Sequence, residues 1–144
     1  MDKNTLLIRL SESARTDFGR IPFESQSDPQ KVFSSLWDLE SHVNNGGFDS
    51  YLRYVDSDVI AYAPAALEAI GALACRAIVH KALILLKSLP PTRDEREDAL
   101  DSLGEADLTK LETLDEEFYK YPDDLTDLLY NFVAARPDTF GEVP

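Results

Sequence analysis

The sequence predicts an all-α protein, a single compact domain of six to eight helices, and three observations support this prediction. Apolar residues recur at intervals of three and four along most of the chain, which is the spacing of one helix face. No alternating run of β-branched residues is long enough to form a convincing strand. Prolines and capping residues precede several apolar segments, as they do at helix starts. The 144 residues are 44% apolar and 28% charged, which is enough for one domain over residues 1–144 to bury a core.

The first predicted helix covers residues 28–45. Asp28 is expected to be its N-cap, with Pro29 at the first helical position, because a carboxylate accepts the free N–H groups there and proline needs none. Its apolar stripe consists of Val32, Leu36, Leu39 and Val43.

The middle of the chain supplies the most apolar helix. A short helix is expected over residues 46–55, and Pro64 is well placed to open another. The run from Ala72 to Leu86 is apolar enough to be the central helix, around which the domain packs. The chain's single cysteine, Cys75, lies in this run, which indicates a buried apolar side chain rather than a disulfide or a zinc ligand.

The last third of the chain contains three further amphipathic helices. The first begins after two prolines, with Thr92 as its N-cap. The other two cover residues 106–121 and 122–135, the latter opened by Pro122, and the tail 136–144 is expected to be frayed.

No targeting or membrane segment is expected. The N-terminus carries Asp2 and only three consecutive apolar residues before Arg9, unlike a signal peptide. The most apolar window, residues 59–79, contains Pro64 and charged residues, unlike a bilayer span. We therefore expect a cytoplasmic protein with no membrane partner.

The net charge of −13 is concentrated in one part of the chain. Residues 1–91 hold 11 acidic and 9 basic residues, whereas residues 92–144 hold 16 acidic and 5 basic residues, a net charge of −11. A surface this negative disfavours direct contact with nucleic acid and favours a basic protein partner.

A stripe of carboxylates is expected within this acidic part. If one helix continues through Gly104, four acidic residues fall at i, i+4, i+7 and i+11 on one face. The ordinary interpretation is a solvated face, and the functional one is a surface that binds a basic partner. The candidate partner-binding residues are Asp94, Asp98, Asp101 and Glu105, continued by Glu112 and Glu116.

The stretch Asn44-Asn45-Gly46-Gly47 predicts a sharp corner between two helices. Asn45 or Gly46 is expected to take the left-handed conformation that ends a helix. Glu40, on a face with apolar bulk, is expected to be mostly buried and to accept backbone N–H groups of residues 44–49. The corner is thus either a structural turn or a small polar pocket for a ligand.

No catalytic constellation, metal site or cofactor motif is found, so we expect neither an enzyme nor a bound cofactor. His42 and His80 fall in different predicted helices, and no nucleophile–base pair is present. Arg93 and Arg96, among the carboxylates of residues 94–101, are expected to form solvated ion pairs along their helix.

The same segments resemble a known family. LESHVNNGGFDSYL, residues 39–52, is similar to the signature of the DNA mimic protein 19-like family of small helical proteins. The resemblance continues over residues 66–72, 90–100 and 111–129 and covers about 30–132. It implies an all-helical fold and allows a homodimer. The founding member is described as an acidic DNA mimic that acts on a DNA-binding regulator.

Three functions therefore remain open. The first is an acidic protein-interaction domain that acts as a DNA mimic towards a basic DNA-binding protein. The second is an immunity or antitoxin-like protein that neutralises a basic partner. The third is a small-ligand binder at the Asn-Asn-Gly-Gly corner.

Overall fold

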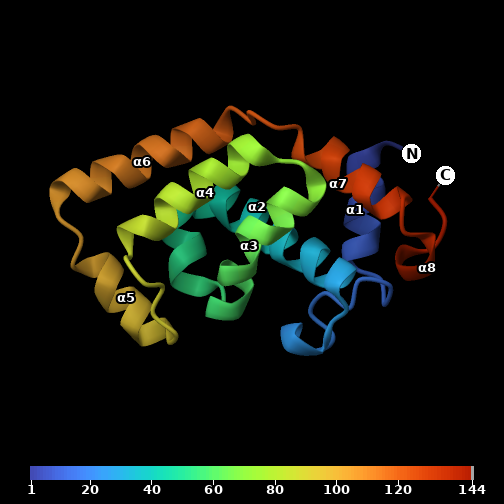
Figure 1. Cartoon of the computed structure of the whole chain (residues 1–144), viewed down its shortest axis with the longest axis horizontal. Coiled ribbons are helices and arrows are strands. Elements are labelled where there is room, and N and C mark those ends of the chain that lie inside the picture. The colour runs from blue at the N-terminus through green and yellow to red at the C-terminus, as the bar shows by residue number, and fades with distance from the viewer. Residues whose placement is uncertain (144) are drawn as a thin grey trace.

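The computed structural model describes residues 1–143, and this part of the chain is all-helical, as the sequence predicts (Figure 1). It forms one compact domain in which α3 and α4 lie in front of α2 in the view of Figure 1. The connection between α5 and α6 lies at the end opposite the two chain termini. The helices are α1 (Lys3–Ser11), a 3-10 turn (Phe23–Ser25), α2 (Asp28–Tyr54), α3 (Ser57–Ile70), α4 (Leu73–Leu85), α5 (Arg93–Asp101), α6 (Glu105–Tyr119), α7 (Leu125–Ala134) and α8 (Pro137–Phe140).

The core is built on α2, which packs against α3, α5 and α6, and not around residues 72–86 as predicted, because one face of α4 is exposed. The predicted apolar helix is α4, which packs between α3 and α6 and buries Cys75, Ile78, Val79 and Ala82. Burial raises the pKa of the Cys75 thiol to about 12, as expected of an unreactive cysteine. Helix α2 contributes the largest set of buried side chains, including Phe33, Leu39, Val43, Phe48 and Tyr51.

Several helix starts differ from the sequence prediction. The N-cap of α2 is Ser27 rather than Asp28, because Ser27 and Gln30 form a reciprocal capping box. Pro64 lies inside α3 rather than at its start, since the helix begins seven residues earlier, at Ser57. Helix α7 begins after Asp124, whose carboxylate accepts the N–H of Asp127. Thr92 caps α5 as predicted.

Both ends of the chain are more ordered than the sequence predicts. Helix α1, which was not expected, is capped by Asp2 and packs on α7 through its buried residues Leu6 and Leu7. The tail predicted to be frayed contains α8, and Phe140 is buried against the rings of Phe33 and Phe132. One aromatic side chain thus holds this segment on the core. The last residue of the predicted tail, 144, lies outside the described residues.

Candidate functional site

The Asn-Asn-Gly-Gly stretch forms a sharp kink between two helical halves of α2, as predicted, with non-helical backbone at Gly46 and Gly47. The prediction that Asn45 or Gly46 is left-handed is wrong, because Gly46 has φ −161° and the positive φ belongs to Gly47, at 69°. A Cβ atom on Gly47 would lie 2.4 Å from Oδ2 of Asp115 on α6. Gly47 therefore meets two demands, a left-handed backbone and the close approach of another helix.

Asp115 caps the second half of α2 across this contact. Its Oδ1 accepts the N–H of Phe48 at 2.7 Å, one of the donors that the kink leaves without a helical partner. Burial raises the pKa of Asp115, and the Phe48 hydrogen bond opposes that rise. The prediction that Glu40 accepts these backbone groups is thus wrong, because Asp115 accepts the Phe48 N–H and Glu40 bonds to Tyr121 instead.

Glu40 and Asn44 instead meet a tyrosine at the end of α6. The Tyr121 hydroxyl donates to Glu40 Oε2 at 3.1 Å and accepts from Asn44 Nδ2 at 2.7 Å. Burial raises the pKa of Glu40. The Tyr119 hydroxyl donates to the Val43 carbonyl at 2.8 Å. This bond satisfies a backbone acceptor near the end of the first half of α2. The corner is therefore joined by hydrogen bonds to α6 and the residues that follow it, and Asn45 lies exposed beside these contacts.

The ligand hypothesis for the corner stays a prediction. Glu40 and Asn44 also line a crevice of about 190 Å³ between α1, α2 and α7, with Trp37 in its wall. Their bonds to Tyr121 give both side chains a structural role whether or not the crevice binds a ligand.

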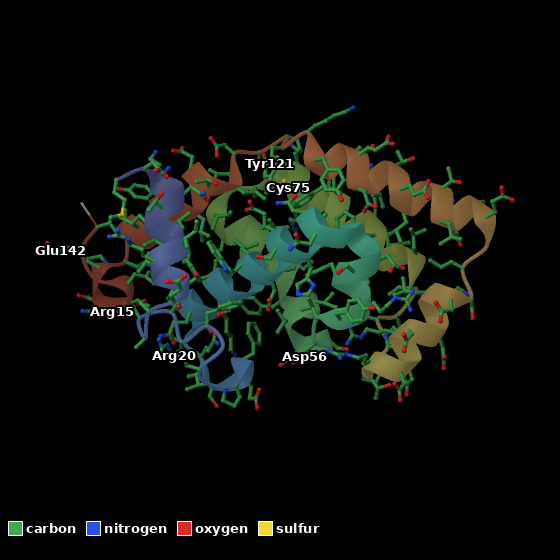
Figure 2. The ribbon with its side chains drawn as sticks, turned by 180° about the vertical axis from the view of Figure 1, so that it is seen from behind. Arg15, Arg20, Asp56, Cys75, Tyr121 and Glu142 are labelled. Atoms are coloured by element: carbon green, nitrogen blue, oxygen red, sulfur yellow. The ribbon has the colours of Figure 1, made fainter. Side chains whose placement is uncertain are left out.

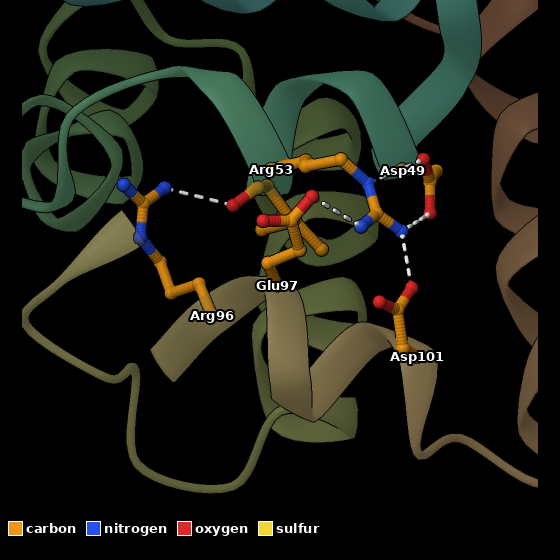
Figure 3. Close-up of polar contacts among 6 residues, drawn as sticks. Asp49, Arg53, Arg96, Glu97 and Asp101 are labelled. Carbon is orange, nitrogen blue, oxygen red and sulfur yellow. Dashed lines mark hydrogen bonds and ion pairs between the residues drawn. The ribbon is translucent and has the colours of Figure 1, made fainter. Parts of the chain in front are cut away.

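Two arginines of α5 bind the end of α2. Arg96, only 1% exposed, donates through Nη1 to the carbonyls of Leu52, at 2.7 Å, and Val55. Figure 3 shows one of these two bonds. Arg93 donates to the Tyr54 carbonyl at 2.8 Å. Solvated ion pairs were predicted for both arginines, and the structure corrects this, because a helix C-terminus presents free carbonyls and negative partial charge to cations.

A third arginine joins the same two helices from the other side. Arg53 of α2 pairs with Asp49 one turn earlier and reaches Glu97 and Asp101 on α5, at 3.3 and 3.1 Å (Figure 3). Asp101 is therefore part of the internal structure as well as of the predicted stripe. Reversing its charge would place a cation beside Arg53.

The predicted stripe of carboxylates is broken. Helix α5 ends at Asp101, and Gly104 is the N-cap of α6, so Glu105 does not continue the face of Asp94 and Asp98. Glycine loses more conformational entropy than other residues when folding holds it in a helix. A helix end is therefore favoured at Gly104. A second stripe begins instead on α6, where Glu105, Glu112 and Glu116 fall at i, i+7 and i+11.

The other carboxylates of this region fall into an internal group and a free group. Asp123 accepts the N–H of Cys75 at 2.8 Å and so caps α4, and Asp127 pairs with Lys3. Within residues 1–143, no ion pair or hydrogen bond engages the side chains of the free group. We name the predicted members of this exposed group the acidic surface; they are Asp94, Asp98, Glu105, Glu112 and Glu116.

The residues that hold this surface in place were not predicted from the sequence. Arg53, Arg96 and Asp115 act across 44 to 67 residues of chain, so local spacing gives no signal for them. Over the described range, no group of three His, Cys, Asp or Glu side chains could hold a metal ion. Within the same range, no helix is both long and apolar enough to cross a membrane.

Comparison with known proteins supplies a family. A family model described as DMP19-like protein matches residues 24–136, which include α2 to α7. Neither the curated proteins nor the solved structures that were searched gave a significant match.

Proposed function

Since the chain belongs to the DMP19-like protein family, we propose that it is an acidic interaction domain that mimics DNA. Its acidic surface would occupy the DNA-binding surface of a basic protein. The observation that carries this proposal is the division of carboxylates between an internal group and an exposed group without partners on α5 and α6.

The charge spacing on α6 supports this function. Without Asp115, which caps α2, the helix has five acidic residues and one lysine, a net charge of −4. At about 1.5 Å per residue its length is roughly 22 Å, so there is about one net charge per 5 to 6 Å. One DNA strand carries about one phosphate per 3.4 Å, so α6 alone reaches more than half of the charge density of a single strand.

Helix α5 would supply a second row of charge. It contributes five acidic and two basic residues, and both arginines face carbonyls of α2. A duplex carries about one charge per 1.7 Å, which two rows approach more closely than one. A homodimer, which the family resemblance allows, would add further rows.

The attachment of α5 and α6 to α2 makes such a surface rigid. Arg96 fixes α5 and Asp115 fixes α6, so the exposed carboxylates are held on helices whose positions are set by buried contacts. A pre-organised surface loses less conformational entropy on binding than a flexible acidic tail.

Affinity capture with matched variants tests this proposal. The protein is immobilised as wild type, as Asp94→Lys/Asp98→Lys, and as Glu24→Lys/Asp138→Lys, a control with the same charge change at exposed residues outside the acidic surface. Wild type and control should retain a basic DNA-binding protein that salt or duplex DNA releases, and the Asp94/Asp98 variant should lose it.

Two results would contradict the proposal. One is equal retention by the Asp94/Asp98 variant, which would leave the acidic surface with a role in solubility only. The other is a basic partner that salt releases but duplex DNA does not. That second result would favour the antitoxin-like alternative, in which the partner is neutralised at a surface that does not bind DNA.

A further inference from the structure

The outward face of α4 differs in charge from the rest of the molecule. Residues 72–91 contain three basic residues and no acidic residue, in a chain with a net charge of −13. Leu73 and Ile84 are 59% and 56% exposed on this face, an unusual exposure for aliphatic side chains. The exposed residues repeat at helical spacing as Leu73, Arg76, Ala77, His80, Lys81 and Ile84.

A groove runs beside this face, between α4 and α6, with a volume of about 380 Å³. Ile84, Leu85 and Leu114 give it an apolar lining. Lys81 of α4 and Lys110 of α6 flank it from the two helices. Apolar side chains can therefore enter the groove while both lysines remain available to anions.

The two lysines have few acidic partners among residues 1–143. Lys81 forms no ion pair with any residue in the described range, and Lys110 has only an exposed contact with Asp107 at 3.8 Å. The one carboxylate among the lining residues is Glu117. An acidic segment is repelled by the acidic surface and by the net charge of −13, so local attraction to the two lysines would favour its binding here.

The groove and the acidic surface lie on adjoining faces of α6. Lys110, Thr113 and Glu117 line the groove toward α4. Glu112 and Glu116 do not line it, and they are exposed beside it on the same helix. Figure 1 shows α4 in front of α2, and Figure 2, from behind, shows α2 in front.

We propose that the groove between α4 and α6 binds an acidic amphipathic helix of a second protein. Leucine-like residues at i, i+3, i+4 and i+7 enter the groove, and flanking carboxylates meet Lys81 and Lys110. This site goes beyond the proposed DNA mimicry, because it selects a partner of the opposite charge. One chain could then hold a basic and an acidic protein at the same time.

A synthetic peptide tests this site without any knowledge of the natural partner. The probe is an amphipathic helical peptide with leucines at i, i+3, i+4 and i+7 and glutamates elsewhere, and the control peptide has lysines in place of the glutamates. Each is titrated into the isotope-labelled full chain and followed by NMR. The glutamate peptide should shift the amide signals of groove residues on α4 and α6, and the lysine peptide should shift those near the acidic surface.

Two pairs of variants make the test specific. Lys81→Glu should weaken binding of the glutamate peptide about tenfold, whereas Lys120→Glu, a control at an exposed lysine outside the groove, should not. Ile84→Ser should also weaken binding, in contrast to Leu108→Ser at an exposed leucine that does not line the groove.

Three outcomes would overturn the proposal. The glutamate peptide could leave the amide signals of the groove residues unchanged. Alternatively, Lys81→Glu and Lys120→Glu could weaken binding of this peptide equally. Sedimentation could also reveal a dimer that Ile84→Ser dissociates, which would assign the groove to a second copy of this chain. None of these results bears on the acidic surface, whose variants are tested separately.

Discussion

Gly47 and Gly46 are neighbours with different requirements. Gly47 needs a left-handed backbone and room for Asp115, whereas Gly46 has an extended φ that any residue can adopt. A side chain at Gly46 would still meet the Cβ of Ser50 at 2.7 Å. A change of Gly46 to valine is therefore expected to lower the melting temperature because of this steric clash, although Gly46 has no positive φ.

Gly47→Ala should lower the free energy of unfolding by roughly 2–4 kcal/mol, because it combines backbone strain with displacement of a helix cap. Gly71→Ala is the matched control, since Gly71 also has a positive φ but a Cβ added there would meet no atom within 4 Å. It should cost only about 1 kcal/mol. Urea unfolding of both variants measures the difference, and equal losses would show that the Asp115 contact contributes nothing.

Asp38 is the residue whose ionisation should be visible in the stability of the protein. Burial raises its pKa from 3.8 to about 6, and the nearby carboxylate of Asp56 adds to the rise. Because the folded state binds this proton more tightly than the unfolded state, the Asp38 contribution is most favourable below pH 3.8. It is lost as the pH rises to about 6.

Asp38→Asn should therefore raise the free energy of unfolding at pH 7 by about 1 kcal/mol or more. The gain should shrink as the pH falls and vanish below about pH 4, where both states of the wild type are protonated. Asp138→Asn, at an exposed aspartate, is the control. Melting curves from pH 4 to 8 test this, and a gain that does not depend on pH would show that Asp38 is not destabilised by burial.

Among the helices, α5 depends on its arginines more than on its apolar residues. Its buried residues are Arg96 and Leu100 only. The guanidinium of Arg96 satisfies carbonyls at the end of α2, while its Nε is buried without a hydrogen-bond partner among residues 1–143. The position of one row of the acidic surface is thus set by a buried cation.

Arg96→Met should lower the free energy of unfolding by about 2–4 kcal/mol, because it leaves buried carbonyls without a donor. Arg93→Met should cost less than about 1 kcal/mol, since Arg93 is exposed and water can replace it. Hydrogen exchange should show the Arg96 variant losing protection first in α5. Equal effects of the two substitutions would contradict the capping role of Arg96.

The helices also show which features the sequence could predict. Local signals identified Thr92 as a cap and the all-helical class, because capping and periodicity act within a few residues. The prediction from Pro64 is wrong, since α3 begins at Ser57, after Asp56, and the proline lies inside the helix. The role of Asp115 depends on a partner 67 residues away, which no local spacing can reveal.

Over the whole molecule, the acidic surface and the groove between α4 and α6 give two adjoining faces of α6 different binding chemistry. The net charge of −13 favours fast encounter with a basic protein, and the attraction should weaken with salt. The apolar groove should respond much less to salt, because burial of its aliphatic lining is not screened by ions. Salt titration of the two binding events should therefore give a steep slope for the first and a shallow slope for the second.

Competition with duplex DNA is the decisive test of DNA mimicry. The basic protein captured on the acidic surface is purified and bound to a fluorescent duplex, and this protein is then titrated into the complex. We expect full displacement of the duplex by the wild type, and displacement at least about tenfold weaker by a variant with Asp94, Asp98, Glu112 and Glu116 changed to lysine. A ternary complex that keeps the duplex bound, or equal displacement by that variant, would contradict DNA mimicry.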